Sequence, residues 1–326
     1  MANNPKAKLK ILYVMQILQE ETDAEHGLSL REIIERLETY GIKAERKGLY
    51  RDIETLREFG IDIKTYQRNP VEYAIDHRDF SLSELMLLVD AVESCKFLTV
   101  RQSRQLIINL KLLASDAQRA LLDRRIHVSG RVASKNESVF GNIDLLHEAL
   151  RKRVKVAFEY YRYDIDGTRV ATRNGAKHIV TPVGIAFSEG YYYLSAWSDE
   201  HDAMSEYRID RMGGLSLSSE PATKNAEILH HTYEGSEYEM FGRFGGEPLT
   251  VTLLVDVGKI EIIVDRFGSS AEIYRHDDEH AKAIVKVCKS EQFFGWIAGL
   301  GATVRIAAPK DLKREYEDYL RSLIED

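Results

Sequence analysis

Residues 45–59 read ERKGLYRDIETLREF, a pattern that predicts an amphipathic helix. Leu49, Ile53 and Leu56 recur at the three- and four-residue spacing that places side chains on one face of a helix. Gly60 follows as the expected stop, because glycine readily adopts the backbone conformation that ends helices. We expect the three apolar side chains to pack inward and the opposite face to carry the chemistry of this helix.

The outward face of this helix is cationic in its first two turns. Lys47, Arg51 and Thr55 lie opposite the apolar residues, with Arg46 before them and Tyr50 at the flank. A recognition helix needs long cations in its N-terminal half, where they reach phosphates and guanine edges, and an apolar back that sets its insertion angle. The pattern therefore favours binding to double-stranded DNA over an ordinary solvated helix face.

Three residues qualify this interpretation. Gly48 lowers helix propensity, and either it lets the backbone approach a phosphate closely or it is simply tolerated near the helix start. Glu54 and Glu58 share the outward face. We therefore expect only the first turns of the helix to lie deep in a groove.

The surrounding residues predict two further helices and a β-hairpin. Apolar residues recur at helical spacing over residues 11–18, and Ser29 with Glu32 forms a capping box that opens a second helix. Alternating apolar and polar residues at 61–66 and 71–75 predict two strands after the third helix. Three helices and a hairpin in this order predict a winged helix-turn-helix.

The predicted hairpin adds two cations, Lys64 and Arg68, where a wing could reach flanking phosphates. The candidate DNA-binding residues are Arg46, Lys47, Gly48, Tyr50, Arg51, Thr55, Lys64 and Arg68. The whole chain has 45 basic and 52 acidic residues, a net charge of −7, which is unusual for a nucleic-acid binder. Residues 41–70, however, hold seven basic and five acidic residues, a local charge of +2, and screening makes the local value the relevant one.

The remainder of the 326-residue chain predicts an α+β multidomain protein. Residues 80–127 are helical in pattern, whereas short strands follow one helix after residue 140 at about ten-residue spacing, as in a small β-barrel or sandwich. Residues 218–246 are rich in loop-forming residues and predict a linker. The expected domains are a winged helix-turn-helix at 1–78, a helical linker at 79–137, a small β-barrel at 138–232 and a ferredoxin-like α+β domain at 247–326.

Tyrosines and arginines gather in the predicted barrel. Tyr160 interleaves with Arg162, while Tyr192 and Tyr193 point to opposite faces of one strand, so that at most one of them lines a given pocket. Single-stranded nucleic acid is held by such a mixture, with aromatic faces for bases and cations for phosphates. Tyrosine and arginine also occur on ordinary barrel surfaces, which is the alternative interpretation.

A second group of candidates follows further along the barrel. Arg208 and Asp210 share a face, and an arginine held by a carboxylate is aimed to grip a phosphate, while Arg211 lies on the other face. His178 precedes a strand and is interpreted as a barrel-surface or pocket residue rather than a general base. The candidate effector-binding residues are Tyr160, Arg162, His178, Tyr192, Tyr193, Arg208, Asp210 and Arg211.

Several segments together resemble the bacterial WYL-domain transcriptional regulators. They are RKGLYRDI (46–53), Asp79-Phe80, Glu84-Leu85, residues 140–163, YYYL (191–194), YRIDRM (207–212), DRFG (265–268) and FFGW (293–296). Tyr192 stands where that family has a tryptophan, and Gly48 where it has a threonine. The resemblance implies that the barrel is an Sm-like WYL domain that senses a nucleotide or single-stranded nucleic acid. It also implies that the last domain is the WYL C-terminal extension, which is associated with dimerisation or ligand response.

Nothing in the sequence points to catalysis. The chain has no Gly-x-Ser-x-Gly elbow, P-loop or dinucleotide fingerprint. His276 and His280 lie among acidic residues in a predicted polar turn, which favours a solvated loop over a metal site. Cys95 and Cys288 belong to no Cys-x-x-Cys pair. We therefore expect no enzyme activity, no cofactor and no metal.

The hydropathy pattern argues against a membrane protein. The longest uncharged apolar stretch, residues 293–304, is too short to span a bilayer. Residues 1–9 are polar and lysine-bearing, unlike a secretory signal. We expect a cytoplasmic location.

The sequence as a whole predicts a homodimeric transcription regulator that binds double-stranded DNA under the control of an effector. A second interpretation is a single-stranded nucleic-acid or nucleotide binding module whose winged helix contacts protein rather than duplex DNA. A third, an enzyme that processes nucleotides, requires a catalytic constellation that the sequence does not provide.

Overall fold

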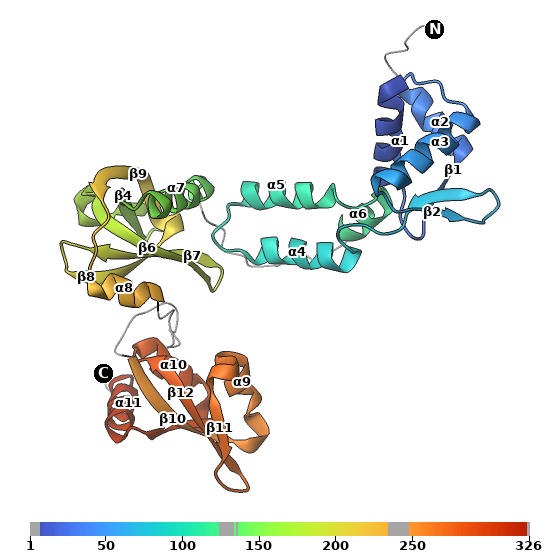
Figure 1. Cartoon of the computed structure of the whole chain (residues 1–326). Coiled ribbons are helices and arrows are strands. Elements are labelled where there is room, and N and C mark those ends of the chain that lie inside the picture. The colour runs from blue at the N-terminus through green and yellow to red at the C-terminus, as the bar shows by residue number, and fades with distance from the viewer. Residues whose placement is uncertain (1–6, 124–133, 135, 234–247, 325–326) are drawn as a thin grey trace. The chain divides into compact units, whose positions relative to one another are not determined.

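The chain forms two compact units, Met1–Glu137 and Ser138–Asp326 (Figure 1). The computed structural model describes residues 7–123, 134, 136–233 and 248–324. Both units combine helices with antiparallel sheets, as the sequence predicts. No helix among the described residues is long and apolar enough to cross a bilayer. The narrower domain boundaries expected from the sequence stay predictions.

The first unit opens with three helices and a small sheet. Its elements are α1 (Ala7–Glu21), β1 (Leu28–Ser29), α2 (Leu30–Thr39), α3 (Arg46–Phe59), β2 (Ile63–Tyr66) and β3 (Glu72–Ile75). The strands have the order β1-β3-β2, and both pairings are antiparallel. The predicted three helices and hairpin are present. The sequence did not indicate β1, because two residues are too few to show an alternating pattern.

The three helices share one apolar core. Leu49, Ile53 and Leu56 of α3 are buried as predicted, and they belong to the same cluster as Val14 of α1 and Ile33 of α2. Complete burial of such a side chain stabilises a fold by about 1.5–3 kcal/mol. These contacts fix the rotation of α3 about its own axis and therefore decide which of its residues face outward.

Local signals start and end these helices where the sequence predicts. The Ser29 hydroxyl accepts a hydrogen bond from the backbone N–H of Glu32, whose carboxylate accepts the N–H of Ser29 at 2.8 Å. Gly60 ends α3 with a φ of 108°, a left-handed conformation that costs glycine no steric strain.

The described residues of the first unit form three more helices. They are α4 (Leu82–Ser94), α5 (Val100–Lys111) and α6 (Asp116–Asp123). Figure 1 shows α4 and α5 side by side in the first unit, where they contact each other. The helical prediction for residues 80–127 is confirmed as far as Asp123, and residues 124–127 lie outside the described part of the chain. Thr99 and Gln102 form a capping box at α5 that the sequence analysis missed.

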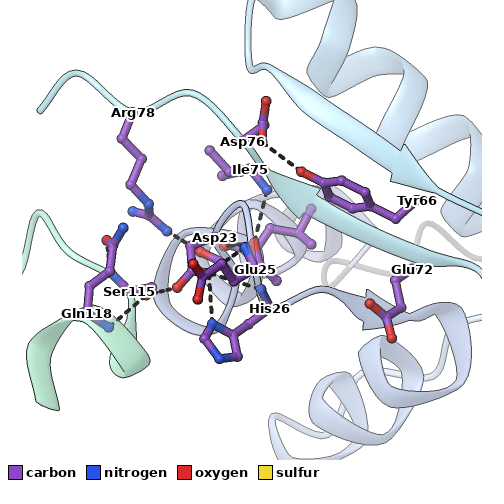
Figure 2. A network of polar contacts seen from close by, with 12 residues as sticks. Asp23, Glu25, His26, Tyr66, Glu72, Ile75, Asp76, Arg78, Ser115 and Gln118 are labelled. Atoms are coloured by element: carbon purple, nitrogen blue, oxygen red, sulfur yellow. Dashed lines mark hydrogen bonds and ion pairs between the residues drawn. The ribbon is translucent and has the colours of Figure 1, made fainter. Parts of the chain in front are cut away.

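A buried carboxylate connects the first helices to this second group (Figure 2). Asp23, which is 5% exposed, follows α1 and accepts a hydrogen bond from the Ser115 hydroxyl at 2.5 Å. It also accepts the backbone N–H groups of Glu25 and His26 at 3.0 Å, and the His26 ring lies 2.8 Å away. Burial alone raises the pKa of Asp23, but the hydrogen bonds from Ser115, His26 and the backbone outweigh it and lower this pKa below its usual 3.8.

Arg78 makes a second connection at the same place. Its guanidinium donates to the carbonyl oxygens of Gln19 at 2.6 Å and Thr22 at 2.5 Å, both at the end of α1. It also donates to the carbonyl of Leu113, just beyond α5, at 3.4 Å. One cation thus satisfies carbonyl groups that the ends of two helices leave without intrahelical partners.

The second unit begins with a helix and a strongly curled sheet. Its elements are α7 (Val139–Lys152), β4 (Val154–Tyr163), β5 (Arg169–Ala171), β6 (His178–Ser188), β7 (Tyr191–Ser198), β8 (Ala203–Arg208), β9 (Met212–Pro221) and α8 (Ala226–Tyr233). The strand order is β5-β4-β6-β7-β8, and β9 pairs with β4, which makes a half-barrel. The predicted linker at 218–246 is wrong in its first part, because β9 and α8 occupy it. The pairing of β9 with the distant β4 leaves no local signal at residues 218–221.

The last part of this unit is an open antiparallel sheet with helices on one face. It consists of β10 (Pro248–Asp256), α9 (Glu261–Phe267), β11 (Glu272–Arg275), β12 (His280–Cys288), α10 (Glu291–Gly299), β13 (Val304–Ala308) and α11 (Lys310–Ser322). The strand order is β11-β12-β10-β13. Every second residue of β10, from Val251 to Val255, is buried with Phe293 of α10 and Leu312 of α11. The predicted succession of strands and helices is present.

We expect Asp23→Asn to loosen the connection between α1 and α6. Hydrogen bonds to a charged group are worth about 1.5–3 kcal/mol, so amide exchange in peptides from both helices should accelerate roughly tenfold or more at pH 7. A carboxylate whose folded pKa lies below its unfolded pKa stabilises the fold above the unfolded value, and this stabilisation is lost as the pH falls through the folded value. The difference between variant and native protein should therefore shrink in acid.

Hydrogen exchange with mass spectrometry on the full chain measures this effect. Glu35→Gln is the matched control, because it removes an exposed carboxylate that pairs with Arg31 within α2. Such pairs contribute only about 0.3–0.5 kcal/mol. Equal exchange in native protein and Asp23→Asn at pH 7 would show that the carboxylate does not hold the two helices together.

Candidate functional site

The outward face of α3 is exposed along the part predicted to contact DNA. Arg46, Lys47, Tyr50, Arg51 and Thr55 are all exposed, and Tyr50 retains 54% of its accessible surface. Within the described part of the chain, neither Lys47 nor Arg51 forms an ion pair. The structure therefore brings these five predicted residues together on one accessible surface, which we call the α3 face.

The beginning of α3 is suited to bind an anion. Glu45 occupies the position before the helix, and its side chain makes no capping hydrogen bond. The first N–H groups of a helix lack intrahelical partners, and the helix dipole gives this end about half a positive charge. A phosphate near Arg46 and Lys47 would meet these N–H groups as well as two cationic side chains.

Gly48 lies beside an ion pair that joins α1 to α3. The Lys10 ammonium of α1 forms an ion pair with Asp52 of α3 at 2.7 Å, and a Cβ atom at Gly48 would lie 3.1 Å from that ammonium. A side chain at this position would need the flexible end of Lys10 to move by only a few tenths of an ångström. The two predictions for Gly48, close approach of a phosphate and tolerance at the helix start, stay predictions.

The two hairpin residues predicted to contact DNA differ in how free their side chains are to reach a phosphate. Lys64 is exposed and lies 3.7 Å from Asp62. Arg68 stacks on the Tyr66 ring at 4.8 Å and donates to the Glu72 carboxylate at 2.8 Å. Contact between Arg68 and a phosphate would have to replace these intramolecular contacts, so Lys64 is the better placed of the two.

Arg57 holds the hairpin against α3. Its guanidinium donates to the Ile63 carbonyl at 2.8 Å and to the Thr65 hydroxyl at 2.7 Å, both on β2. It also donates to Glu54 at 3.2 Å, one turn earlier in α3. These bonds set the position of the hairpin relative to the α3 face.

The second candidate site is an aromatic cluster in the half-barrel. The His178 ring stacks on Phe158 with centroids 5.6 Å apart, and Tyr160 and Tyr207 pack edge-on against both rings. Burial lowers the pKa of His178 and raises that of Tyr160. These shifts keep both rings neutral around pH 7, which suits stacking with a planar ligand.

An arginine–carboxylate pair lies beside this cluster. Arg208 donates two hydrogen bonds to Asp210, from Nε at 3.0 Å and from Nη2 at 2.8 Å. Its guanidinium also lies over the Tyr191 ring, 3.4 Å from the centroid, and its backbone N–H donates to the Tyr160 hydroxyl at 3.0 Å. Asp210 is buried, so the pair predicted from the sequence forms and is held rigidly from both sides.

Arg211 differs from Arg208 in its bonding. Its Nε is buried and has no hydrogen-bond partner among the described residues. A buried N–H without a partner costs about 1–3 kcal/mol, a penalty that an acceptor on a ligand could remove. Arg211 also influences the Tyr160 hydroxyl electrostatically, which places it near the same aromatic cluster.

The other residues predicted to bind an effector lie in different environments. Tyr193 is buried opposite Arg208 in the β7–β8 ladder, whereas Tyr192 lies beside Phe187 with ring centroids 4.9 Å apart. The prediction that the two tyrosines point to opposite faces agrees with these contacts. Arg162 is exposed, and no described contact connects it to the aromatic cluster.

The sequence did not indicate three residues of this region: Phe158 and Tyr207 in the aromatic cluster, and Tyr191 beneath the Arg208 guanidinium. Strand alternation offered a signal for Phe158 and Tyr191. Phe158 is two residues from Tyr160, and Tyr191 is two from Tyr193, so each shares a face with a predicted residue.

We also looked for a metal site among the described residues. No group of three His, Cys, Asp or Glu side chains with the spacing of a metal site occurs within them. His280 instead lies 3.0 Å from Asp277 in the turn between β11 and β12.

Two family models match the second unit. The WYL domain model matches residues 141–217, and the WCX domain model matches residues 247–324. The chain therefore carries a WYL domain and a WCX domain. No curated protein sequence matches the chain.

Two solved structures show low similarity to the chain. Proteasome accessory factor B/C (PafBC) of Arthrobacter aurescens is 16% identical, with a TM-score of 0.25, and the match covers 94% of this chain but only 45% of that one. A CRISPR Cas-related protein is 14% identical, with a TM-score of 0.37, and the match covers 73% of this chain and 71% of that one. Scores this low carry no argument about fold or function.

We expect Asp210→Ala to destabilise the half-barrel by about 2–4 kcal/mol. The variant leaves Arg208 partly buried without its carboxylate, and breaking a buried pair in this way costs more than the pair itself contributes. The Arg208 side chain keeps 19% of its exposure, which places the expected cost somewhat below that of a fully buried pair.

Urea unfolding followed by tryptophan fluorescence measures this cost. A Trp296→Phe background leaves the buried Trp197 of β7 as the only tryptophan. Glu200→Ala breaks the more exposed pair with Arg173 and should change stability by less than about 1 kcal/mol. Equal effects of the two substitutions would contradict the buried role of Asp210.

Proposed function

Since the chain carries a WYL domain and a WCX domain after a unit with an exposed cationic helix, we propose that it is an effector-controlled transcription regulator that binds double-stranded DNA. In this proposal the first three helices and the hairpin are a winged helix-turn-helix. The WYL domain is an Sm-like barrel, and the WCX domain is a ferredoxin-like fold. The protein is cytoplasmic and is not an enzyme.

The single observation that carries DNA binding is the α3 face. Its cations are exposed at the start of the helix and form no ion pair with any residue that the structure describes, while Leu49, Ile53 and Leu56 bury the opposite side. A helix anchored in this way enters a major groove with its N-terminal residues toward the bases. Lys47 and Arg51 lie one turn apart, so both can reach the same stretch of the DNA.

The effector proposed for the WYL domain is a nucleotide or a short single strand of nucleic acid. Tyr160 and His178 are the half-buried rings of the cluster and are the ones proposed to meet a base, whereas Phe158 and Tyr207 are buried behind them. Stacking contributes about 1–3 kcal/mol per base. Arg211 supplies an Nε–H donor that has no hydrogen-bond partner among the described residues, and phosphate oxygens are acceptors that match it. An effector changes DNA affinity only if it binds more tightly to one arrangement of the two units than to another.

We further propose that the regulator is a homodimer. Two copies match an operator with two half-sites, which is how helix-turn-helix proteins commonly bind DNA. Helices α4 and α5 support this proposal, because Leu87, Val100 and Ile108 expose large parts of their apolar side chains. Exposed apolar surface of this kind is typical of a protein–protein interface.

Lys47→Ala and Arg51→Ala should each weaken binding to duplex DNA. Each variant should also lower the slope of log affinity against log salt concentration by about one, because each removes roughly one phosphate contact and its released counterion. Fluorescence anisotropy with a labelled duplex at several salt concentrations measures both quantities.

Arg101→Ala on α5 is the matched control, since it removes an exposed cation outside the α3 face. It should leave affinity and slope unchanged. Unchanged binding in both α3 variants would reject the interface. Preference of the native chain for a single-stranded oligonucleotide over the duplex would favour the alternative, a single-stranded binding module whose winged helix contacts protein.

A further inference from the structure

Glu54 is an acidic residue on the outward side of α3, next to the α3 face. It follows Arg51 by three residues and Lys47 by seven, so the three side chains form one stripe along the helix. Its side chain keeps 62% of its accessible surface, while the opposite side of α3 is buried in the core. If α3 lies in a groove of DNA, Glu54 therefore faces the same DNA as Lys47 and Arg51.

A carboxylate in this position has an electrostatic cost. The phosphates of DNA repel it, and a charge that enters a groove without finding a hydrogen-bond donor loses its water without compensation. The sequence therefore predicts that Glu54 and Glu58 both limit how deeply α3 enters a groove. The structure distinguishes the two residues, because Glu54 pairs with Arg57, whereas Glu58 forms no ion pair within the described part of the chain.

Arg57 holds one oxygen of the Glu54 carboxylate. Its Nη1 atom donates to Glu54 Oε2 at 3.2 Å, while Nε and Nη2 donate to the Ile63 carbonyl and the Thr65 hydroxyl of β2. The pair is too exposed to add much stability, but it restricts the rotamers of Glu54 and partly neutralises its charge. The other oxygen, Oε1, accepts no hydrogen bond from the described residues. Glu54 thus presents one positioned acceptor on the outward side of α3.

The position of Glu54 along α3 suits contact with bases. An α-helix rises about 1.5 Å per residue, so Glu54 lies about 4.5 Å beyond Arg51 and about 10 Å beyond Lys47 along the axis. Neighbouring base pairs are about 3.4 Å apart. In a helix that follows the major groove, Glu54 is therefore within about three base pairs of the bases that Lys47 reaches.

The base edges in the major groove determine which base a carboxylate can bind. Guanine presents two acceptors there, and thymine presents an acceptor and a methyl group, so neither offers a donor. Adenine presents its N6 amino group beside the N7 acceptor, whereas cytosine presents its N4 amino group with no acceptor next to it. A carboxylate, which only accepts, therefore matches cytosine best. An amide, which donates and accepts, matches adenine.

We propose that Glu54 is a specificity-determining residue that accepts a hydrogen bond from the N4 amino group of a cytosine in the major groove. This inference rests on the proposed binding of α3 to double-stranded DNA. Arg57 keeps the carboxylate in place through its own bonds to β2. The carboxylate weakens binding to sequences that lack this amino group, so it contributes selectivity more than affinity.

Selection of bound sequences from a random library of double-stranded DNA tests the proposal with the full chain and without a known target site. The native chain should select a motif that contains one position occupied by cytosine. Glu54→Gln should keep the rest of the motif and change this position to adenine, because a glutamine amide pairs with the N6 and N7 atoms of adenine. Glu58→Gln is the matched control, since it removes an exposed carboxylate one turn later, and it should leave the motif unchanged.

Fluorescence anisotropy with single duplexes measures the size of the effect. Replacement of this cytosine by adenine in the selected site should weaken binding of the native chain roughly tenfold, a factor within the range for one mismatched base pair. Glu54→Ala should bind the cytosine and adenine duplexes about equally. It should also bind an unrelated duplex more tightly than the native chain does, because it lacks the repelling charge.

The proposal fails if the native motif contains no selected cytosine, or if Glu54→Gln selects the native motif. It also fails if Glu58→Gln produces the same change, or if Glu54→Ala gains affinity equally for every duplex, since the carboxylate would then only repel DNA. In these cases the native chain still binds double-stranded DNA, so the proposed function stands. A native chain that binds no double-stranded DNA would reject the proposed function, and the role of Glu54 with it.

Discussion

The burial of one side of α3 is the constraint on which the first unit depends. Leu49 is fully buried, and Ile53 and Leu56 are nearly so, in a core shared with α1 and α2. Rotation of α3 by even one residue would move these side chains toward water, at about 1.5–3 kcal/mol for each one exposed. The outward position of Lys47 and Arg51 is therefore a consequence of core packing, and it needs no partner molecule to hold it.

The candidate site of the half-barrel depends on a different constraint, because a buried carboxylate lies beside its aromatic cluster. Asp210 is buried with its charge, and it is compensated by two hydrogen bonds from Arg208, whose other face is covered by Tyr191. Arg211 is the contrasting case, because its buried Nε lacks a hydrogen-bond partner in the part of the chain that the structure describes. A site of this kind is preorganised, since the side chains that would bind a ligand are already fixed by their neighbours.

Within the first unit, the partial charges at helix ends determine where several charged side chains lie. The start of α3 is positive and faces outward, whereas its end at Gly60 is negative. Arg78 and Asp23 occupy adjacent positions in the polar network that joins α1 to α6 (Figure 2). The first three helices are thus joined to α4–α6 by charged side chains that form hydrogen bonds at helix ends. Apolar contacts add to this connection.

The sequence by itself determined the features that depend on neighbours a few residues apart. The capping box at Ser29, the stop at Gly60 and the apolar stripe of α3 all follow from spacing along a helix. The pairing of Arg208 with Asp210 was also expected from their two-residue spacing, although Asp210 lies in a short 3-10 helix directly after β8 and not on the strand. Only the tertiary structure decided which groups meet across long distances in the chain. Asp23 meets Ser115, and Lys10 of α1 pairs with Asp52 of α3, because such contacts depend on how whole elements pack and leave no periodic trace in the sequence.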